Sequence, residues 1–201
     1  MAVKTPRLPA AERREQLLDV TKDIVSRLGF HAVSIEAVAR EAGVSRPIVY
    51  GHFQDLQGLL EALVEREDFR ALAQLASVLP TGELARTDPK DALLTALRGY
   101  LSAAQADPVT WRLVLMPQEG APDVLREHIA RGRTAVLNQL AEAVEPGLGP
   151  GRESPDPELT ARMLSAAADE AVRLVLTDPE RWSADRILAH TRWVLDQLGR
   201  G

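Results

Sequence analysis

The chain of 201 residues contains no cysteine. This absence excludes disulfide bonds and metal sites built from thiolates, and it fits the reducing interior of a cell. No apolar run approaches the length of a membrane span, and residues 1–18 lack the apolar stretch of a secretory signal peptide. We therefore expect a soluble, cytoplasmic protein with no membrane partner.

Strand patterns and catalytic signatures are also missing. Runs of alternating β-branched and aromatic residues do not occur, whereas the helix formers alanine, leucine and arginine dominate. The histidines do not follow the His-x-x-x-His spacing of a metal site, and there is no nucleophile elbow. We predict an all-α protein that is not an enzyme and uses no cofactor or metal ion.

The net charge of −5 at first argues against a nucleic-acid partner. However, residues 1–53 carry eight Lys and Arg against six Asp and Glu, which leaves this part at +2 and the remainder at −7. A DNA-binding module needs only a local positive field. Lys4, Arg7, Arg13 and Arg14 form a loose basic arm that either reaches DNA or is a disordered, solubilising tail.

The most informative stretch is residues 34–53, SIEAVAREAGVSRPIVYGHF. Its first half predicts a short helix with one apolar face, because Ile35, Val38, Ala39 and Ala42 follow helical spacing. Ser34 precedes this helix and is a suitable N-cap. Gly43 follows it, where a residue without Cβ can adopt the left-handed conformation that ends a helix.

The second half predicts another helix, with Ser45 as its cap and Pro47 in its first turn. Val49 and Phe53, four residues apart, give it an apolar side. Arg46, Tyr50 and His52 face outward and can donate to guanine edges or phosphate oxygens. This is the pattern of a helix-turn-helix whose second helix lies on DNA; an αα-hairpin with a solvated face is the alternative.

Together with Gly29-Phe30, the motifs Val38-Ala39, Ala42-Gly43-Val44-Ser45 and Val49-Tyr50-x-His52-Phe53 resemble the DNA-binding region of TetR-family (tetracycline-repressor-like) regulators. The resemblance covers roughly residues 11–64. It implies a bracing first helix at residues 12–28, a DNA-binding domain at 1–55 and a helical ligand-binding and dimerisation domain at 56–201. The DNA-contacting positions that we expect are Ser34, Ser45, Arg46, Pro47, Ile48, Tyr50, Gly51 and His52.

Two positions depart from the family pattern. Ile48 stands where a small hydroxyl residue is frequent; it cannot donate a hydrogen bond but can touch a thymine methyl group. Leu56 occupies a position that is often lysine, which removes one expected phosphate contact. Asp55 remains a good N-cap for the next helix.

The remainder of the chain keeps helical spacing, interrupted by segments rich in proline and glycine. These interruptions predict loops at residues 80–89, 117–122 and 146–157. The helices that we expect between them lie at residues 56–79, 91–106, 108–116, 123–144, 158–177 and 183–198.

The last two helices suggest a homodimer. Ile187, Thr191, Val194 and Leu198 form one apolar stripe, and small residues around Ala167 in the preceding helix allow a close approach. These helices either pair with a symmetry mate as a four-helix bundle or only close their own core. We favour the dimer, because two copies of the helix-turn-helix can then bind two half-sites of a palindromic operator.

The middle of the chain is the expected sensor of a small-molecule effector, an expectation that rests mainly on the resemblance. These helices carry large side chains and a few polar groups, the kinds of residue that usually line a ligand pocket. The pocket residues that we predict are Tyr100, Trp111, Met116, Met163, Glu170 and Arg173, although ordinary core packing is the alternative for each.

We therefore predict a ligand-responsive transcriptional regulator that binds double-stranded DNA and most simply acts as a repressor released by its effector. One alternative is a DNA-binding protein that senses no ligand, or an activator. The other is a helical small-molecule-binding protein or enzyme with a vestigial DNA-binding head.

Overall fold

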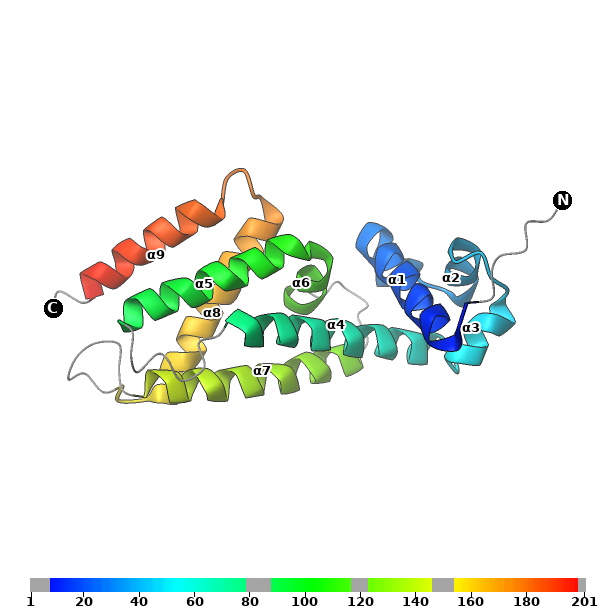
Figure 1. The fold of residues 1–201 in the computed structure, drawn as a ribbon, viewed down its shortest axis with the longest axis horizontal. Helices are drawn as coiled ribbons and strands as arrows, with labels where there is room; N and C mark the ends of the chain where they lie inside the picture. The colour runs from blue at the N-terminus through cyan, green and yellow to red at the C-terminus, as the bar shows by residue number, and fades with distance from the viewer. Residues whose placement is uncertain (1–7, 79–87, 117–122, 146–153, 199–201) are drawn as a thin grey trace. The chain divides into compact units, whose positions relative to one another are not determined.

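The computed structural model describes residues 8–78, 88–116, 123–145 and 154–198. All regular structure in these ranges is helical, which confirms the predicted all-α class (Figure 1). None of the helices there is long and apolar enough to cross a membrane. The predicted loops fall largely outside the described residues, and so do Lys4 and Arg7 of the basic arm.

The helices follow the predicted segments closely. The first three α-helices are α1 (Ala10–Leu28), α2 (Ile35–Glu41) and α3 (Arg46–His52), with a short 3-10 helix, η1 (Phe30–Ala32), after α1. They are followed by α4 (Leu56–Val78), α5 (Pro89–Ala106), α6 (Pro108–Leu115), α7 (Asp123–Val144), α8 (Pro157–Thr177) and α9 (Ala184–Leu198).

The chain divides into two compact units. The first comprises residues 1–66 and 118–127, and the second comprises residues 67–117 and 128–201. The division therefore falls inside α4, whereas the expected domain boundary lies at residue 55, just before this helix begins.

The first unit is held together by the apolar faces of its short helices. α1 contacts both η1 and α2, and α2 contacts α3. Gly29 follows the last residue of α1, with φ 86° and its N–H bonded to the Val25 carbonyl. The fully or almost fully buried apolar side chains include Leu17, Leu18, Ile24, Val25, Val38, Val49, Phe53, Leu59 and Leu63.

Two local expectations in the first unit were wrong. Arg13 and Arg14 belong to α1 and not to a free arm; Arg13 is buried and bonds Gln16. The Ser45 side chain makes no capping hydrogen bond, although Ser45 holds the N-cap position of α3.

In the second unit α5 lies against both α8 and α9, and α6 packs on α5 and α8 (Figure 1). The core cluster is centred on Leu101, Ala104, Trp111, Val172 and Val175. Prolines at the first helical position and aspartate caps set the starts of α5, α6 and α8, since the missing proline N–H needs no partner there.

The apolar stripe of α9 faces its own unit. Leu188 is buried in the core cluster, Ile187 packs against it, and Thr191 is half-buried. Among the residues whose side chains are described, the large apolar side chains that remain exposed on α8 and α9 are Leu159, Met163 and Trp193. Ile187 and Thr191 of the predicted stripe thus lie toward the core of their own unit, whereas the side chain of Leu198 lies outside the described ones.

Candidate DNA-binding and ligand-binding sites

The turn between α2 and α3 is fixed by local hydrogen bonds. The Ser34 hydroxyl accepts from the Ala37 N–H at 3.1 Å and caps α2. At the other end of α2, Val44 N–H donates to Ala39 carbonyl at 2.9 Å and Gly43 N–H donates to Arg40 carbonyl at 3.2 Å. With Gly43 at φ 66°, these two bonds form a Schellman motif, which reverses the chain and starts α3.

α3 has one buried and one exposed side. Val49 is fully buried and Phe53, just after the helix, is almost so, which anchors α3 on the first unit. The exposed side chains and glycine on the helix are Arg46, Pro47, Ile48, Tyr50 and Gly51, and His52 is half-buried. The predicted DNA-facing residues therefore share a surface, and the serines Ser34 and Ser45 stand at the starts of α2 and α3.

Arg14 of α1 fixes the far end of α3. Its guanidinium lies 4.6 Å from the centroid of the Phe53 ring and donates to the His52 carbonyl at 3.4 Å. A cation placed at the C-terminus of a helix also complements the helix dipole. Arg14, which sequence reasoning assigned to a flexible arm, thus holds the α3 helix in place.

Arg46 is not free in this structure. Its guanidinium donates to the Glu36 carboxylate of α2 at 2.7 Å, and both side chains are well exposed. Exposed ion pairs are worth at most about 1 kcal/mol. A phosphate or a guanine can therefore compete with Glu36 for this guanidinium at little cost.

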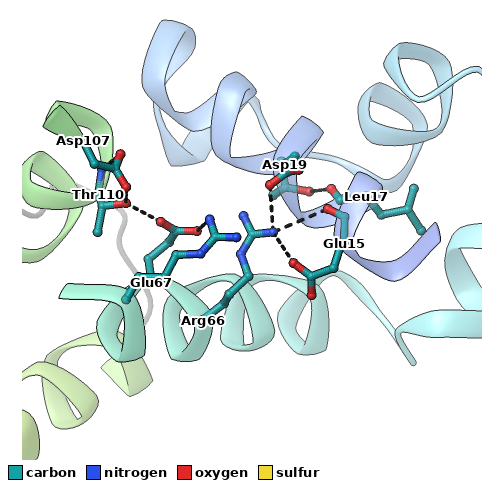
Figure 2. A network of polar contacts seen from close by, with 9 residues as sticks. Glu15, Leu17, Asp19, Arg66, Glu67, Asp107 and Thr110 are labelled. Atoms are coloured by element: carbon teal, nitrogen blue, oxygen red, sulfur yellow. Dashed lines mark hydrogen bonds and ion pairs between the residues drawn. The ribbon is translucent and has the colours of Figure 1, made fainter. Parts of the chain in front are cut away.

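Two polar clusters anchor α4 at adjacent residues, one in each unit (Figure 2). Within the first unit, Arg66 bonds the carboxylates of Glu15 at 2.9 Å and Asp19 at 2.8 Å on α1. Within the second unit, the buried Glu67 carboxylate accepts from the Thr110 hydroxyl and from Arg70. Each unit thus fixes its own part of α4 by charged hydrogen bonds.

The second unit contains a partly open cavity of about 210 Å³, lined by residues of α4, α5, α6, α7, α8 and α9. Its wall is mostly apolar. Tyr100 and Trp111 line it, with ring centroids 4.9 Å apart in an edge-to-face arrangement. The Trp111 N–H donates to Gln74 at 2.8 Å, so the indole offers a ligand only its ring.

The polar part of the wall was missed by the sequence reasoning. Asp169 accepts a 2.9 Å hydrogen bond from the Tyr100 hydroxyl and forms an ion pair with Arg133. Burial raises the pKa of Tyr100, against the opposing charges of Arg133 and Arg173, so the phenol remains a donor. Asp68 lines the same cavity. An aspartate inside a helical apolar stripe, such as Asp169, was the signal that could have pointed to this group.

The other predicted pocket residues lie outside the cavity lining. Met116 is half-buried against the core cluster, and Met163 is exposed to 66% of its surface. Glu170 is exposed and pairs with Arg173. The stripe of large side chains on α8 was visible in the sequence, but which side of α8 faces inward depends on the helices that cover it.

Arg173, which was predicted to line the pocket, instead has a structural role. It donates to the Leu115 carbonyl at the end of α6 at 3.2 Å, while Arg112 of α6 donates to the Leu176 carbonyl at the end of α8 at 2.8 Å. Each arginine thus satisfies a carbonyl that the last turn of the other helix leaves without an intrahelical partner. This reciprocal pair fixes α6 against α8.

The amino-terminal part of the chain has recognisable relatives. Residues 17–63 match the family described as bacterial regulatory proteins, tetR family. The chain is 31% identical over 108 residues to the HTH-type transcriptional activator FasR of Mycolicibacterium smegmatis, which covers 54% of this chain and 48% of FasR. It is also 31% identical over 133 residues to the HTH-type transcriptional regulator BetI of Yersinia pestis, covering 65% of this chain and 66% of BetI.

The aligned part of the chain thus spans about half to two thirds of the length of these curated relatives. A solved structure of a TetR-like transcriptional regulator from Rhodococcus sp. RHA1 is similar over nearly the whole length, with a TM-score of 0.71, 25% identity, and coverage of 93% of this chain and 97% of that one. The helix-turn-helix, the family match and the fold agree: the chain belongs to the TetR family of bacterial regulatory proteins.

Proposed function

We propose that this protein is a homodimeric transcriptional repressor that binds a palindromic operator and releases it on binding a small molecule. The observation that carries the DNA-binding part is the two-sided α3 helix. Val49 anchors it in the core, while Arg46, Pro47, Ile48, Tyr50 and Gly51 remain exposed on its surface. A short helix held in this way can enter a major groove.

Each exposed residue suits a different contact. Once its guanidinium leaves Glu36, Arg46 can donate two hydrogen bonds to a guanine or a phosphate, and Tyr50 can donate one to a phosphate oxygen. Ile48 and Pro47 offer apolar contact, for example with a thymine methyl group. Among the exposed residues of α3, only Arg46 has a charged guanidinium that can donate two hydrogen bonds to one base. We therefore propose that each half-site is read through few direct hydrogen bonds and that contacts with phosphates supply most of the affinity.

The cavity of the second unit is the proposed effector site. It is apolar over most of its wall and contains a small polar group around Asp169, which is the usual make-up of a small-molecule site. For release of DNA, the effector must bind better to a state with low operator affinity than to the DNA-bound state.

The exposed apolar side chains of the last two helices support the dimer. Leu159 and Met163 are one helical turn apart on α8, and Trp193 is exposed on α9, where its ring stacks on His190. Large exposed apolar groups commonly mark a protein interface. We propose that a second copy of the chain covers them.

The test uses a duplex selected by the protein from a random pool. The double variant Arg46→Ala and Tyr50→Phe should remain a folded dimer by sedimentation and circular dichroism, and it should lose operator binding in fluorescence anisotropy. A reporter gene behind the operator gives the sign of regulation, repression or activation. Undiminished DNA binding by the double variant would exclude α3 as the DNA-binding helix.

A further inference from the structure

The wall of the cavity in the second unit indicates what kind of effector it suits. This inference rests on the proposed function, because it concerns the ligand of the same site. Most of the lining residues are alanine, valine and leucine, so the hydrophobic effect favours a ligand with a hydrocarbon body. The polar residues of the wall then decide which polar group such a ligand can carry.

The ionised groups of the wall already have partners within the protein. Among the described lining residues, the charged ones are Asp68, Arg133 and Asp169. Asp169 forms an ion pair with Arg133 and accepts a 2.9 Å hydrogen bond from the Tyr100 hydroxyl. Asp68 also interacts with another group of the protein. The positive charge of Arg173 acts on the Tyr100 phenol as well, so charges of both signs surround this part of the wall.

A charged ligand would therefore gain little in this cavity. An ion that leaves water loses its hydration, and it recovers this loss only where an unpaired opposite charge or several hydrogen bonds receive it. A ligand ammonium meets Asp169 already paired with Arg133, and a ligand carboxylate meets Arg133 already paired with Asp169. Desolvation thus disfavours either ion relative to a neutral ligand of the same shape.

Two hydroxyl groups of the wall, in contrast, are not used by the protein. Ser165 of α8 and Thr191 of α9 line the cavity, and neither makes a hydrogen bond within the described part of the chain. Three other helical threonines do donate to the carbonyl four residues earlier, namely Thr21, Thr95 and Thr160. A hydroxyl can both donate and accept, so it suits a neutral alcohol or carbonyl group.

We propose that the cavity binds an uncharged ligand, a hydrocarbon that carries one hydroxyl or carbonyl group. This polar group would form a hydrogen bond with the Ser165 or the Thr191 hydroxyl, and the hydrocarbon part would lie against Leu75, Leu97 and Leu140. An engineered cavity of about 150 Å³ holds benzene, so a cavity of about 210 Å³ suits a ligand on the order of ten non-hydrogen atoms.

Three probes of nearly equal length test the proposal on the full-length protein without DNA. They are 1-heptanol, heptylamine and heptanoic acid, which are neutral, cationic and anionic at neutral pH. Titration calorimetry should give 1-heptanol at least about tenfold tighter binding than either charged probe, because only the alcohol enters without losing the hydration of an ion.

The loss of both hydroxyls locates the polar end of the ligand. The double variant Ser165→Ala with Thr191→Val nearly keeps the shape of the wall and should weaken 1-heptanol binding about fivefold or more, because its hydrogen bond is lost. The matched control is Ser102→Ala, at an exposed position of α5 outside the lining, which should leave the affinity unaltered. If the double variant does not fold, the two single variants are compared, and one of them must show the loss.

Equal or tighter binding of heptylamine or heptanoic acid would overturn the proposal, and so would a failure of 1-heptanol to bind at millimolar concentration. An unaltered affinity for 1-heptanol in the hydroxyl variants would also overturn it. An operator-release assay with 1-heptanol is scored separately: an alcohol that binds but does not release DNA contradicts the ligand-responsive function and leaves the neutral-ligand site standing.

Discussion

Two glycines in the DNA-binding region serve different purposes. Gly43 has φ 66°, so its conformation, and not a lack of space, requires glycine. Apart from its chain neighbours and the backbone of its own helix, nothing lies within 4 Å of the position that a Cβ on Gly51 would take, and its φ is not positive. Gly51 is thus replaceable in the folded protein, and its small size leaves room for a partner on the exposed side of α3.

Gly51→Ala should therefore stabilise the protein, by up to about 1 kcal/mol from helix propensity, and still weaken operator binding. Gly43→Ala is the contrasting variant, expected to destabilise by about 1–2 kcal/mol through left-handed strain. Urea unfolding and anisotropy on the selected operator measure both effects. Unchanged operator affinity for Gly51→Ala would show that this surface does not approach DNA closely.

The Arg46–Glu36 pair makes a second residue-scale prediction. Glu36→Gln should change the free energy of unfolding by less than about 1 kcal/mol, because the pair is exposed. It should also raise affinity for DNA of random sequence, since Arg46 then has no competing carboxylate and the surface loses a negative charge. Anisotropy at two salt concentrations tests this; lower affinity would mean that Glu36 itself supports binding.

At the scale of single residues, the sequence predicted those features that depend on hydrogen bonds between residues close together in the chain. The capping by Ser34 and the left-handed Gly43 follow from residues within a few positions of each other. The free Ser45 side chain and the partnership of Tyr100 with Asp169 could not be predicted in the same way. The second contact joins residues 69 positions apart, and only the packing of α5 on α8 brings them together.

At the scale of the element, helix boundaries were predictable and helix faces less so. The starts of α5, α6 and α8 are set by proline and aspartate within the segment itself. The side of α8 that faces inward is set by the helices packed against it. Leu164 lines the cavity, whereas Met163, which was predicted as a pocket residue, is exposed.

The two serine caps allow a test at the level of helices. Ser34→Ala removes a capping bond of 3.1 Å and should cost about 1 kcal/mol in unfolding free energy. Ser45→Ala should cost clearly less, since its side chain makes no such bond. Urea denaturation compares them, and equal losses would contradict the capping assignment.

The reciprocal pair formed by Arg112 of α6 and Arg173 of α8 allows a second test at the level of helices. Arg112→Ala should destabilise the second unit by about 1–2 kcal/mol, because the end of α8 loses its charged donor. Arg112→Lys keeps the charge and should recover part of the loss. Thermal unfolding followed by circular dichroism is the measurement, and an unaltered melting temperature for Arg112→Ala would count against the cap.

At the scale of the whole molecule, assembly connects the exposed apolar residues with DNA binding. Met163→Glu places a charge on the exposed side of α8 and should convert the dimer to monomer, while Glu158→Gln, on the same helix, should not. Sedimentation velocity gives the oligomeric state. A Met163→Glu protein that remains dimeric would place the interface elsewhere.

The family and the all-α fold could be read from the sequence because the helix-turn-helix combines many fixed spacings within residues 34–53. The cavity could not, since its wall is assembled from six helices. What the cavity holds and how two copies assemble depend on contacts between segments far apart in the chain, for which no local spacing exists.

The most direct test of the account is selection of bound DNA by the full-length protein from a random pool, followed by sequencing. The account predicts enrichment of an inverted repeat whose half-site centres lie about 34–36 Å apart or a multiple of one helical turn. It also predicts that the Arg46→Ala variant fails to enrich the same sequence. A pool without any preferred sequence, or the same repeat enriched by Arg46→Ala, would contradict it.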